Sequence, residues 1–395
     1  MLRKNRLFTP GPTPLLPSAQ VAMASAAMHH RTADFRALYL AALAGLKEFI
    51  GTTHDVVLLT ASGTGAMEAS VSNLASPGDK VLVLTAGKFG ERWTELAKAY
   101  GCAPAVVSAP YGTTFSLDAV RAALTPEIRC VYMQATETST GVRHDVRGVA
   151  ELLRGTEALL VVDAITGLGT TAFEVDAWGI DVIIGGSQKA LMIPPGLAYA
   201  AVSERAWKRM ESARSPRYYF DLRKERKAGA RGEAAFTPAT SLVAALAAAL
   251  EEVRRLGQDS IAAGRDLLIA NAELCAAMTR AAAAALGLKL FAAASPAAAV
   301  TAISSPEGVD SGDIVKGFRE MFDAVVANGQ GEMKGKLFRV AHLGYYDYMD
   351  TLAVIGALEH VLARCLRPKH IEFGTGLKAA QRVYASSASA QGPHP

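Results

Sequence analysis

Over about the first 240 positions, short continuous apolar runs alternate with longer segments of helical periodicity. Apolar runs of about four to eight residues between turn residues are typical of strands buried on both faces. The runs predict strands at 56–60, 80–85, 130–134, 158–163, 182–185 and 197–202, and helices at 65–73, 90–100 and 146–153. This alternation indicates the α/β class, with a mostly parallel sheet of the seven-stranded type covered by helices.

The pattern changes after about residue 240, where helices become longer and strands fewer. It predicts helices at 239–256, 260–286 and 347–364, with short strands at 299–304 and 337–341. This mixture is typical of a smaller α+β domain. We therefore expect an N-terminal arm at 1–20, a large domain at 21–240, a small domain at 241–370 and a flexible tail rich in Ala, Ser, Gly and Pro at 371–395.

Composition narrows the possible functions. Half of the 395 residues are hydrophobic, and 41 Lys and Arg against 37 Asp and Glu give a net charge of +4, too mild to indicate nucleic acid. The four cysteines form no CxxC pair or cluster with histidine, which favours a reducing compartment, no disulfide framework and no metal site. The N-terminus lacks the apolar segment of a signal peptide, and the longest apolar runs are too short to span a bilayer. We expect a cytoplasmic protein that binds neither membrane nor nucleic acid.

The strongest chemical signal is a lysine and an aspartate at the ends of two predicted strands. Lys189 follows the Gly-Gly-Ser turn at 185–187 and is flanked by apolar residues, although lysine is rarely buried without a partner or a task. Asp163 ends the predicted strand 158–163. A surface lysine and a helix-capping acid are the ordinary alternatives. Together the pair favours pyridoxal phosphate (PLP) chemistry, in which lysine forms a Schiff base and the acid keeps the pyridine nitrogen protonated.

A second signal is the segment Ser62-Gly63-Thr64-Gly65, which follows one predicted strand and opens a helix. Backbone N–H groups at a helix start, with nearby hydroxyls, bind phosphate groups, and glycine lets the backbone approach closely. Many such turns only cap a helix. The segment is neither a Walker A loop nor a GxGxxG turn, which weakens a nucleotide-binding alternative.

Seven motifs in order resemble the class V, fold-type I aminotransferases, in particular the alanine–glyoxylate and serine–pyruvate (or serine–glyoxylate) enzymes. The motifs are FTPGPT at 8–13, HR-x3-F at 30–35, ASGTGAMEA at 61–69, ETSTG at 137–141, VVDAITGLG at 161–169, GSQKAL at 186–191 and FRVAHLG at 338–344. The resemblance runs from Phe8 to about Arg364. It implies a homodimer with shared active sites and transamination between a small amino acid, alanine or serine, and glyoxylate or pyruvate.

The resemblance also implies a role for each site residue. Lys189 would carry PLP and shuttle the proton, Asp163 would bind the pyridine nitrogen, and Arg339 would bind the substrate carboxylate at two points. The expected cofactor contacts are Ser62, Gly63, Thr64 and Gln188 at the phosphate with Ser187 nearby, Phe89 and Ile165 on the two ring faces, Thr138 near the ring oxygen or Asp163, and Thr237 at the neighbouring subunit's phosphate.

Some positions depart from the family pattern. Phe89 stands where many relatives carry tryptophan. Some relatives carry histidine where Thr64 stands and tyrosine near Phe236, and the loss of a tyrosine hydroxyl could mean one fewer phosphate contact. The alternatives are other class V enzymes (aspartate or phosphoserine aminotransferase, cysteine desulfurase or lyase) and a non-catalytic PLP-fold binding protein. Gln188 stands where desulfurases typically place histidine, and the intact Lys189, Asp163 and Arg339 argue against a non-catalytic role.

Overall fold

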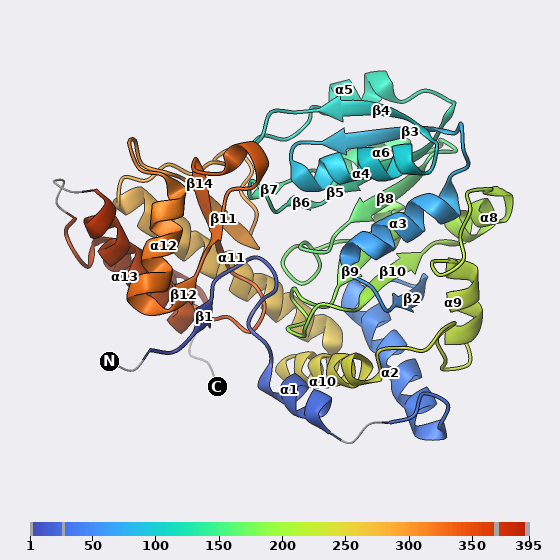
Figure 1. The fold of residues 1–395 in the computed structure, drawn as a ribbon, viewed down its shortest axis with the longest axis horizontal. Coiled ribbons are helices and arrows are strands. Elements are labelled where there is room, and N and C mark those ends of the chain that lie inside the picture. The colour runs from blue at the N-terminus through green and yellow to red at the C-terminus, as the bar shows by residue number, and fades with distance from the viewer. Residues whose placement is uncertain (1–2, 26–27, 367–370, 392–395) are drawn as a thin grey trace.

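The computed structural model describes residues 3–25, 28–366 and 371–391. Its largest sheet has seven strands: β2 (Asp55–Leu59), β3 (Lys80–Thr85), β4 (Ala103–Ser108), β5 (Ile128–Gln134), β8 (Leu159–Asp163), β9 (Val182–Gly186) and β10 (Ala198–Val202). Their spatial order is β2-β10-β9-β8-β5-β3-β4 (Figure 1). β10 is antiparallel to both neighbours and the other adjacent pairs are parallel. The expected mostly parallel α/β sheet is confirmed.

Both faces of this sheet are buried because each strand is apolar at successive positions. On β8, Leu160 and Val162 join one core, whereas Leu159 and Val161 join the core on the opposite face. The first core includes side chains of α2 (Ala33–Ile50), α6 (Val146–Leu153) and α10 (Thr240–Leu256). The second includes side chains of α3 (Gly63–Leu74), α4 (Lys88–Ala99) and α8 (Glu204–Ser212). The result is a three-layer domain.

The smaller part of the chain contains a three-stranded antiparallel sheet of β11 (Val300–Ser304), β14 (Leu337–Ala341) and β13 (Ala327–Asn328). Its core is shared with α11 (Ile261–Ala285), α12 (Ser311–Phe322) and α13 (Tyr348–Cys365). The N-terminal arm begins in this part, where β1 (Arg6–Leu7) pairs with β12 (Ala324–Val325). The arm then crosses to α1 (Pro17–Ala24), which lies beside α10 (Figure 1). It therefore links the two parts.

All helices and strands expected from the sequence are present, with ends shifted by at most two residues. The sequence pattern did not predict α2 and β4. It also did not predict several shorter or later elements: α5 (Leu117–Ala123), β6 (Thr136–Glu137), β7 (Val142–Arg143), α7 (Val175–Trp178), α9 (Leu222–Gly229), the 3-10 helix Gly331–Met333 and α14 (Thr375–Gln391).

Two expected boundaries need correction. Helix α10 was assigned to the small domain, but Val243, Leu246 and Leu250 pack in the core of the large sheet. The tail was expected to be flexible from residue 371, yet residues 375–391 form α14. This helix places Leu377 and Ala380 on the small-domain core, and Ala- and Ser-rich composition hid that apolar spacing. Residues 392–395 of the expected tail lie outside the described residues.

Helix α11 is long and apolar enough to cross a membrane by length and composition alone. In the structure it packs along α14 and α10, and Cys275, Met278 and Ala282 are buried in the small-domain core. These contacts explain why α11 is apolar, because it packs as a helix of the protein core.

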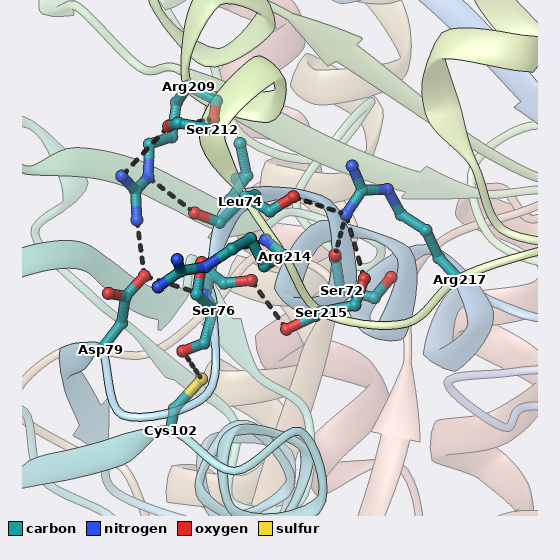
Figure 2. Close-up of polar contacts among 12 residues, drawn as sticks. Ser72, Leu74, Ser76, Asp79, Cys102, Arg209, Ser212, Arg214, Ser215 and Arg217 are labelled. Carbon is teal, nitrogen blue, oxygen red and sulfur yellow. Dashed lines mark hydrogen bonds and ion pairs between the residues drawn. The ribbon is translucent and has the colours of Figure 1, made fainter.

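The C-terminal end of α3 is fixed by arginines from α8 and the segment after it (Figure 2). Arg209 donates from Nε to the carbonyl of Leu74 at 2.9 Å and forms an ion pair with Asp79. Arg217 donates from Nη1 to the carbonyl of Ser72 at 3.0 Å. Cations stabilise the carbonyl end of a helix, whose dipole is negative there. These contacts hold the helix whose opposite end forms part of the site described next.

Candidate active site

A cavity of about 240 Å³ lies beyond the carboxyl ends of β8 and β9, under the N-terminal arm. Ligands of open α/β sheets bind at this edge of the sheet. Nine residues expected from the sequence line this cavity together: Ser62, Gly63, Thr64, Phe89, Thr138, Asp163, Ile165, Gln188 and Lys189. Ser187, Thr237 and Arg339 do not line it.

Lys189 lies in the turn after β9, and its side chain is buried. Its Nζ donates a hydrogen bond to the carbonyl of Pro10 in the arm. The arm backbone passes so close that a Cβ on Gly11, at φ +148°, would lie 2.7 Å from Nζ. Burial lowers the pKa of Lys189 to about 8, the charge of Asp163 opposes this shift, and Arg339 adds to it. A substantial fraction of the amine is therefore neutral near pH 8, as a nucleophile requires.

Asp163 ends β8, which is the parallel neighbour of β9. Its Oδ1 accepts a hydrogen bond from the N–H of Ile165 at 2.9 Å. Burial, helped by the nearby charge of Glu137, raises the pKa of Asp163 to about 6, although this hydrogen bond and the charges of Lys189 and Arg92 oppose the rise. A buried carboxyl of this kind is suited to a cationic partner, because a buried charge is stabilised by pairing.

The start of α3 supplies groups for an anion. Ser62 is the N-cap residue, and its hydroxyl makes no capping hydrogen bond to the helix. A Cβ on Gly63 would lie 2.2 Å from Cδ1 of Ile165, so a larger residue would force Ile165 to move. The amide oxygen of Gln188 is buried without a hydrogen-bond partner among the described residues. Hydroxyl and backbone N–H donors around the N-terminus of a helix fit a phosphate, to which Gln188 can donate through its amide N–H group and not through this oxygen.

Phe89 forms an aromatic wall of the cavity and is held from behind by Glu137. The Glu137 carboxylate accepts N–H groups of Phe89 at 3.1 Å, Gly90 at 3.0 Å and Ser139 at 3.1 Å. The bonds from Phe89 and Gly90 satisfy amides in the first turn of α4 and fix where the ring of Phe89 lies. Burial raises the pKa of Glu137, although the hydrogen bonds oppose the rise. The sequence showed Glu137 only as part of a motif.

Thr138 and Ser187 both make hydrogen bonds within the chain. The Thr138 hydroxyl lines the cavity but donates to Oγ1 of Thr166 at 2.8 Å. The Ser187 hydroxyl donates to the carbonyl of Pro194 at 2.7 Å and accepts the N–H of Leu197 at 3.2 Å. Ser187 thereby closes the turn that carries Lys189. Its expected cofactor contact stays a prediction.

Arg339 comes from β14 of the small domain and lies behind the cavity wall. It is buried, and burial lowers its pKa to about 10. Its guanidinium donates to the carbonyls of Asn328 and Thr138, and it is near enough to Lys189 to affect the pKa of that lysine. Thr237 is exposed on the surface, in a different hollow of the same chain.

Six further residues line the cavity and were not assigned to the site from the sequence: Gly11, Pro12, Arg92, Thr136, Thr166 and Pro195. Arg92 lines it, three residues after Phe89 on α4, and this spacing places both on one face of the helix. Gly11 and Pro12 of the arm cover Lys189. The three-residue spacing between Phe89 and Arg92 could have identified Arg92 from the sequence, once Phe89 had been assigned to the site.

The chain is similar to known proteins along nearly all of its length. The family model described as aminotransferase class-V matches residues 18–327. A soluble hydrogenase small subunit from Synechococcus sp. (strain PCC 6716) is 39% identical over 98% of this chain and 100% of that protein. An L-aspartate–glyoxylate aminotransferase from Paracoccus denitrificans is 35% identical over 99% and 98%, and a serine–glyoxylate aminotransferase from Methylorubrum extorquens is 34% identical over 90% of each chain.

The fold also matches a solved structure. An aspartate aminotransferase of subgroup IV from Thermus thermophilus superimposes with a TM-score of 0.85 at 37% sequence identity. The match covers 92% of this chain and 100% of that chain.

Proposed function

This chain belongs to the class-V aminotransferases, which use pyridoxal phosphate, and we propose that it transfers the amino group of alanine or serine to glyoxylate or pyruvate. The observation that carries the proposal is the meeting of Lys189 and Asp163 in one buried cavity, at the ends of adjacent parallel strands. A nucleophilic amine beside a buried acid is the pair that PLP chemistry requires.

The residues of the cavity fit PLP. Asp163 would pair with the pyridine nitrogen, and Phe89 and Ile165 would cover the two faces of the ring. The hydroxyls of Ser62 and Thr64 and the amide N–H group of Gln188 would hold the phosphate. When bound, PLP supplies an electron sink for the charge that develops at the substrate's α carbon.

The chain's own groups would bind the substrate and move its proton. Lys189 Nζ would take the proton from the α carbon and release it again, which a pKa of about 8 permits in both directions. Arg339 would bind the α-carboxylate that every donor and acceptor carries. The arm residues Gly11 and Pro12 cover Lys189 and would limit the access of water to the reacting groups.

Charge at the cavity supports a small neutral donor. Among the described residues that line it, Lys189 and Arg92 are the cations, and Arg92 lies beside Thr64 at the start of α3. A donor with a side-chain acid would therefore lack a separate counter-charge near Arg339. The two glyoxylate aminotransferases among the relatives support glyoxylate as the acceptor.

Aspartate is the second candidate donor, because two similar proteins are named for aspartate.

A cysteine desulfurase would need an accessible thiol at the site. Cys102, Cys130 and Cys275 are buried, and burial raises the pKa of the Cys275 thiol to about 11. The name of the cyanobacterial relative describes a hydrogenase subunit. Among the described residues of this chain, no three His, Cys, Asp or Glu side chains are grouped as metal ligands.

We also propose a cytoplasmic homodimer in which Thr237 reaches the phosphate site of the partner. Thr237 is exposed beside Phe236, and the exposed rings of Tyr218 and Tyr219 pack on Phe236 with centroid distances of 5.6 and 5.0 Å. An exposed aromatic group supports an interface with another chain. A mass of one chain at micromolar concentration, with full activity, would contradict the dimer.

The function is tested with purified protein. Wild type should be yellow, and borohydride should remove its visible band and leave the cofactor attached to Lys189, as located by peptide mass spectrometry. Lys189→Ala should fold normally and show no transamination. Turnover near that of wild type would contradict the assignment of Lys189 as the catalytic lysine. Wild-type kcat/KM is then compared for alanine, serine, aspartate and phosphoserine with glyoxylate, pyruvate and 2-oxoglutarate. A preference for aspartate would replace the proposed donor and leave the reaction class intact.

A further inference from the structure

Arg92 is the charged group at the cavity that the reaction described above leaves without a task. Its Nη1 donates a 2.9 Å hydrogen bond to Oγ1 of Thr64, in the first turn of α3. Its guanidinium carbon lies 5.0 Å from the ring centroid of Phe89. The ion pairs found between described residues do not include Arg92, although Glu91 beside it pairs with Lys88. The cation therefore faces the cavity without a carboxylate partner in the described structure.

The hydrogen bond from Arg92 fixes how the Thr64 hydroxyl can act. A hydroxyl has one donor hydrogen and two acceptor lone pairs. When Oγ1 accepts from Arg92, its own hydrogen points away from the guanidinium and is free for another acceptor. A donor that is itself hydrogen-bonded to a cation is polarised and binds an anion more strongly. Thr64 is thereby prepared to donate to an anion in the cavity.

The surroundings indicate where that anion lies. Thr64 stands beside the N-cap residue Ser62, where the dipole of the 12-residue helix α3 is positive. Gln188 lines the same cavity, and its amide N–H group is the part of the side chain that can donate to an anion. A phosphate carries up to two negative charges and needs several donors. Charge and hydrogen-bond capacity both match this end of the cavity.

We propose that Arg92 is a positioning residue for the cofactor phosphate, which orients the Thr64 hydroxyl as a donor and supplies the balancing positive charge. The inference rests on the cofactor being PLP and adds a residue to its binding. The competing explanations are that Arg92 only supports the ring of Phe89, or that it binds the side-chain acid of an aspartate donor.

The test compares the binding of two cofactor forms to apoprotein, PLP and pyridoxal, which differ only in the phosphate. Arg92→Gln should raise the Kd of PLP by about tenfold to a hundredfold, the range for a lost charged hydrogen bond, while the Kd of pyridoxal changes by less than about twofold. Lys98→Gln, which removes the same charge from an exposed position on α4, should change neither. Binding is followed by the visible absorbance and by quenching of tryptophan fluorescence.

A double-mutant cycle with Thr64→Val separates the orienting role from charge alone. If Arg92 acts through the hydroxyl, Arg92→Gln should weaken PLP binding less in the Thr64→Val background than in wild type. Full additivity would overturn the orienting role.

An equal loss of PLP and pyridoxal binding would overturn the phosphate role in favour of support for Phe89. Unchanged PLP binding with a raised KM for aspartate alone would overturn it in favour of a substrate site. Failure of the wild-type protein to bind PLP would overturn the cofactor assignment itself, and the inference with it.

Discussion

Arg339 on β14 donates a 2.9 Å hydrogen bond from Nη1 to the backbone carbonyl of Thr138, 201 positions earlier in the chain. The carbonyl of Asn328 accepts from Nε at 3.2 Å and from Nη2 at 2.7 Å. A guanidinium has five N–H groups, so these three bonds leave two, one on each terminal nitrogen. Two free N–H groups on a fixed plane are what a carboxylate binds at two points.

We therefore expect Arg339→Lys to raise KM for every amino acid and oxo acid by about tenfold to a hundredfold. Lysine keeps the charge but cannot retain both backbone contacts and offer two parallel donors. Steady-state kinetics with at least two donors and two acceptors measures the effect. Arg319→Lys, at an exposed position of α12, is the control. A rise confined to one substrate would show that Arg339 reads a side chain.

Asp163→Asn should reduce kcat by roughly a thousandfold and leave the protein folded. Asparagine keeps a carbonyl to accept the N–H of Ile165, but it lacks the negative charge that favours a protonated pyridine nitrogen. A loss of about 4 kcal/mol of barrier lowering corresponds to that factor. Single-turnover rates and thermal unfolding are measured together. Rates within a few fold of wild type would show that Asp163 only ends its strand.

The capture of PLP by the apoprotein should depend on pH through Lys189. Only the neutral amine attacks, and burial lowers the pKa of Lys189 to about 8. The rate constant should rise about tenfold per pH unit below pH 8 and become constant above it. Because the charge of Asp163 raises the pKa of Lys189, Asp163→Asn should move the midpoint to lower pH. Stopped-flow absorbance measures both curves, and a midpoint near 10 would contradict the buried amine.

Glu225 should make stability fall as pH rises. Its carboxylate accepts the N–H of Ala235 at 3.1 Å, and burial raises its pKa to about 7 from the usual 4.5. The folded state therefore binds more protons than the unfolded state between these values, so the free energy of unfolding decreases with pH in this window. The decrease is on the order of 3 kcal/mol, at about 1.4 kcal/mol per pH unit.

Glu225→Gln should remove this slope and be relatively more stable at pH 8. Urea unfolding at pH 4.5, 6 and 8 measures the difference from wild type, with Glu211→Gln at an exposed position of α8 as the control. Equal slopes in wild type and Glu225→Gln would mean that Glu225 stays charged in the folded protein.

The sequence by itself determined six of the seven strands of the large sheet and the chemical type of the site, whereas elements such as α2 and β4 were not anticipated. Apolar runs such as 159–162 and the helical spacing of 146–153 are local patterns, and burial on one or both faces of an element leaves them readable along the chain. The acid and the lysine ending two predicted strands indicated PLP chemistry, because parallel strands bring their carboxyl ends to the same edge of a sheet.

Tertiary structure alone decided which groups meet there. Arg92 reaches Thr64, Glu137 holds Phe89, and the arm at Gly11 covers Lys189, through contacts between segments that no local spacing relates. The same reason explains why α14 was not anticipated, because it packs on a core that its composition concealed. The hydrophobic periodicity of the sequence indicates which residues are buried. Which group a buried polar side chain bonds to depends on the packing of the whole chain.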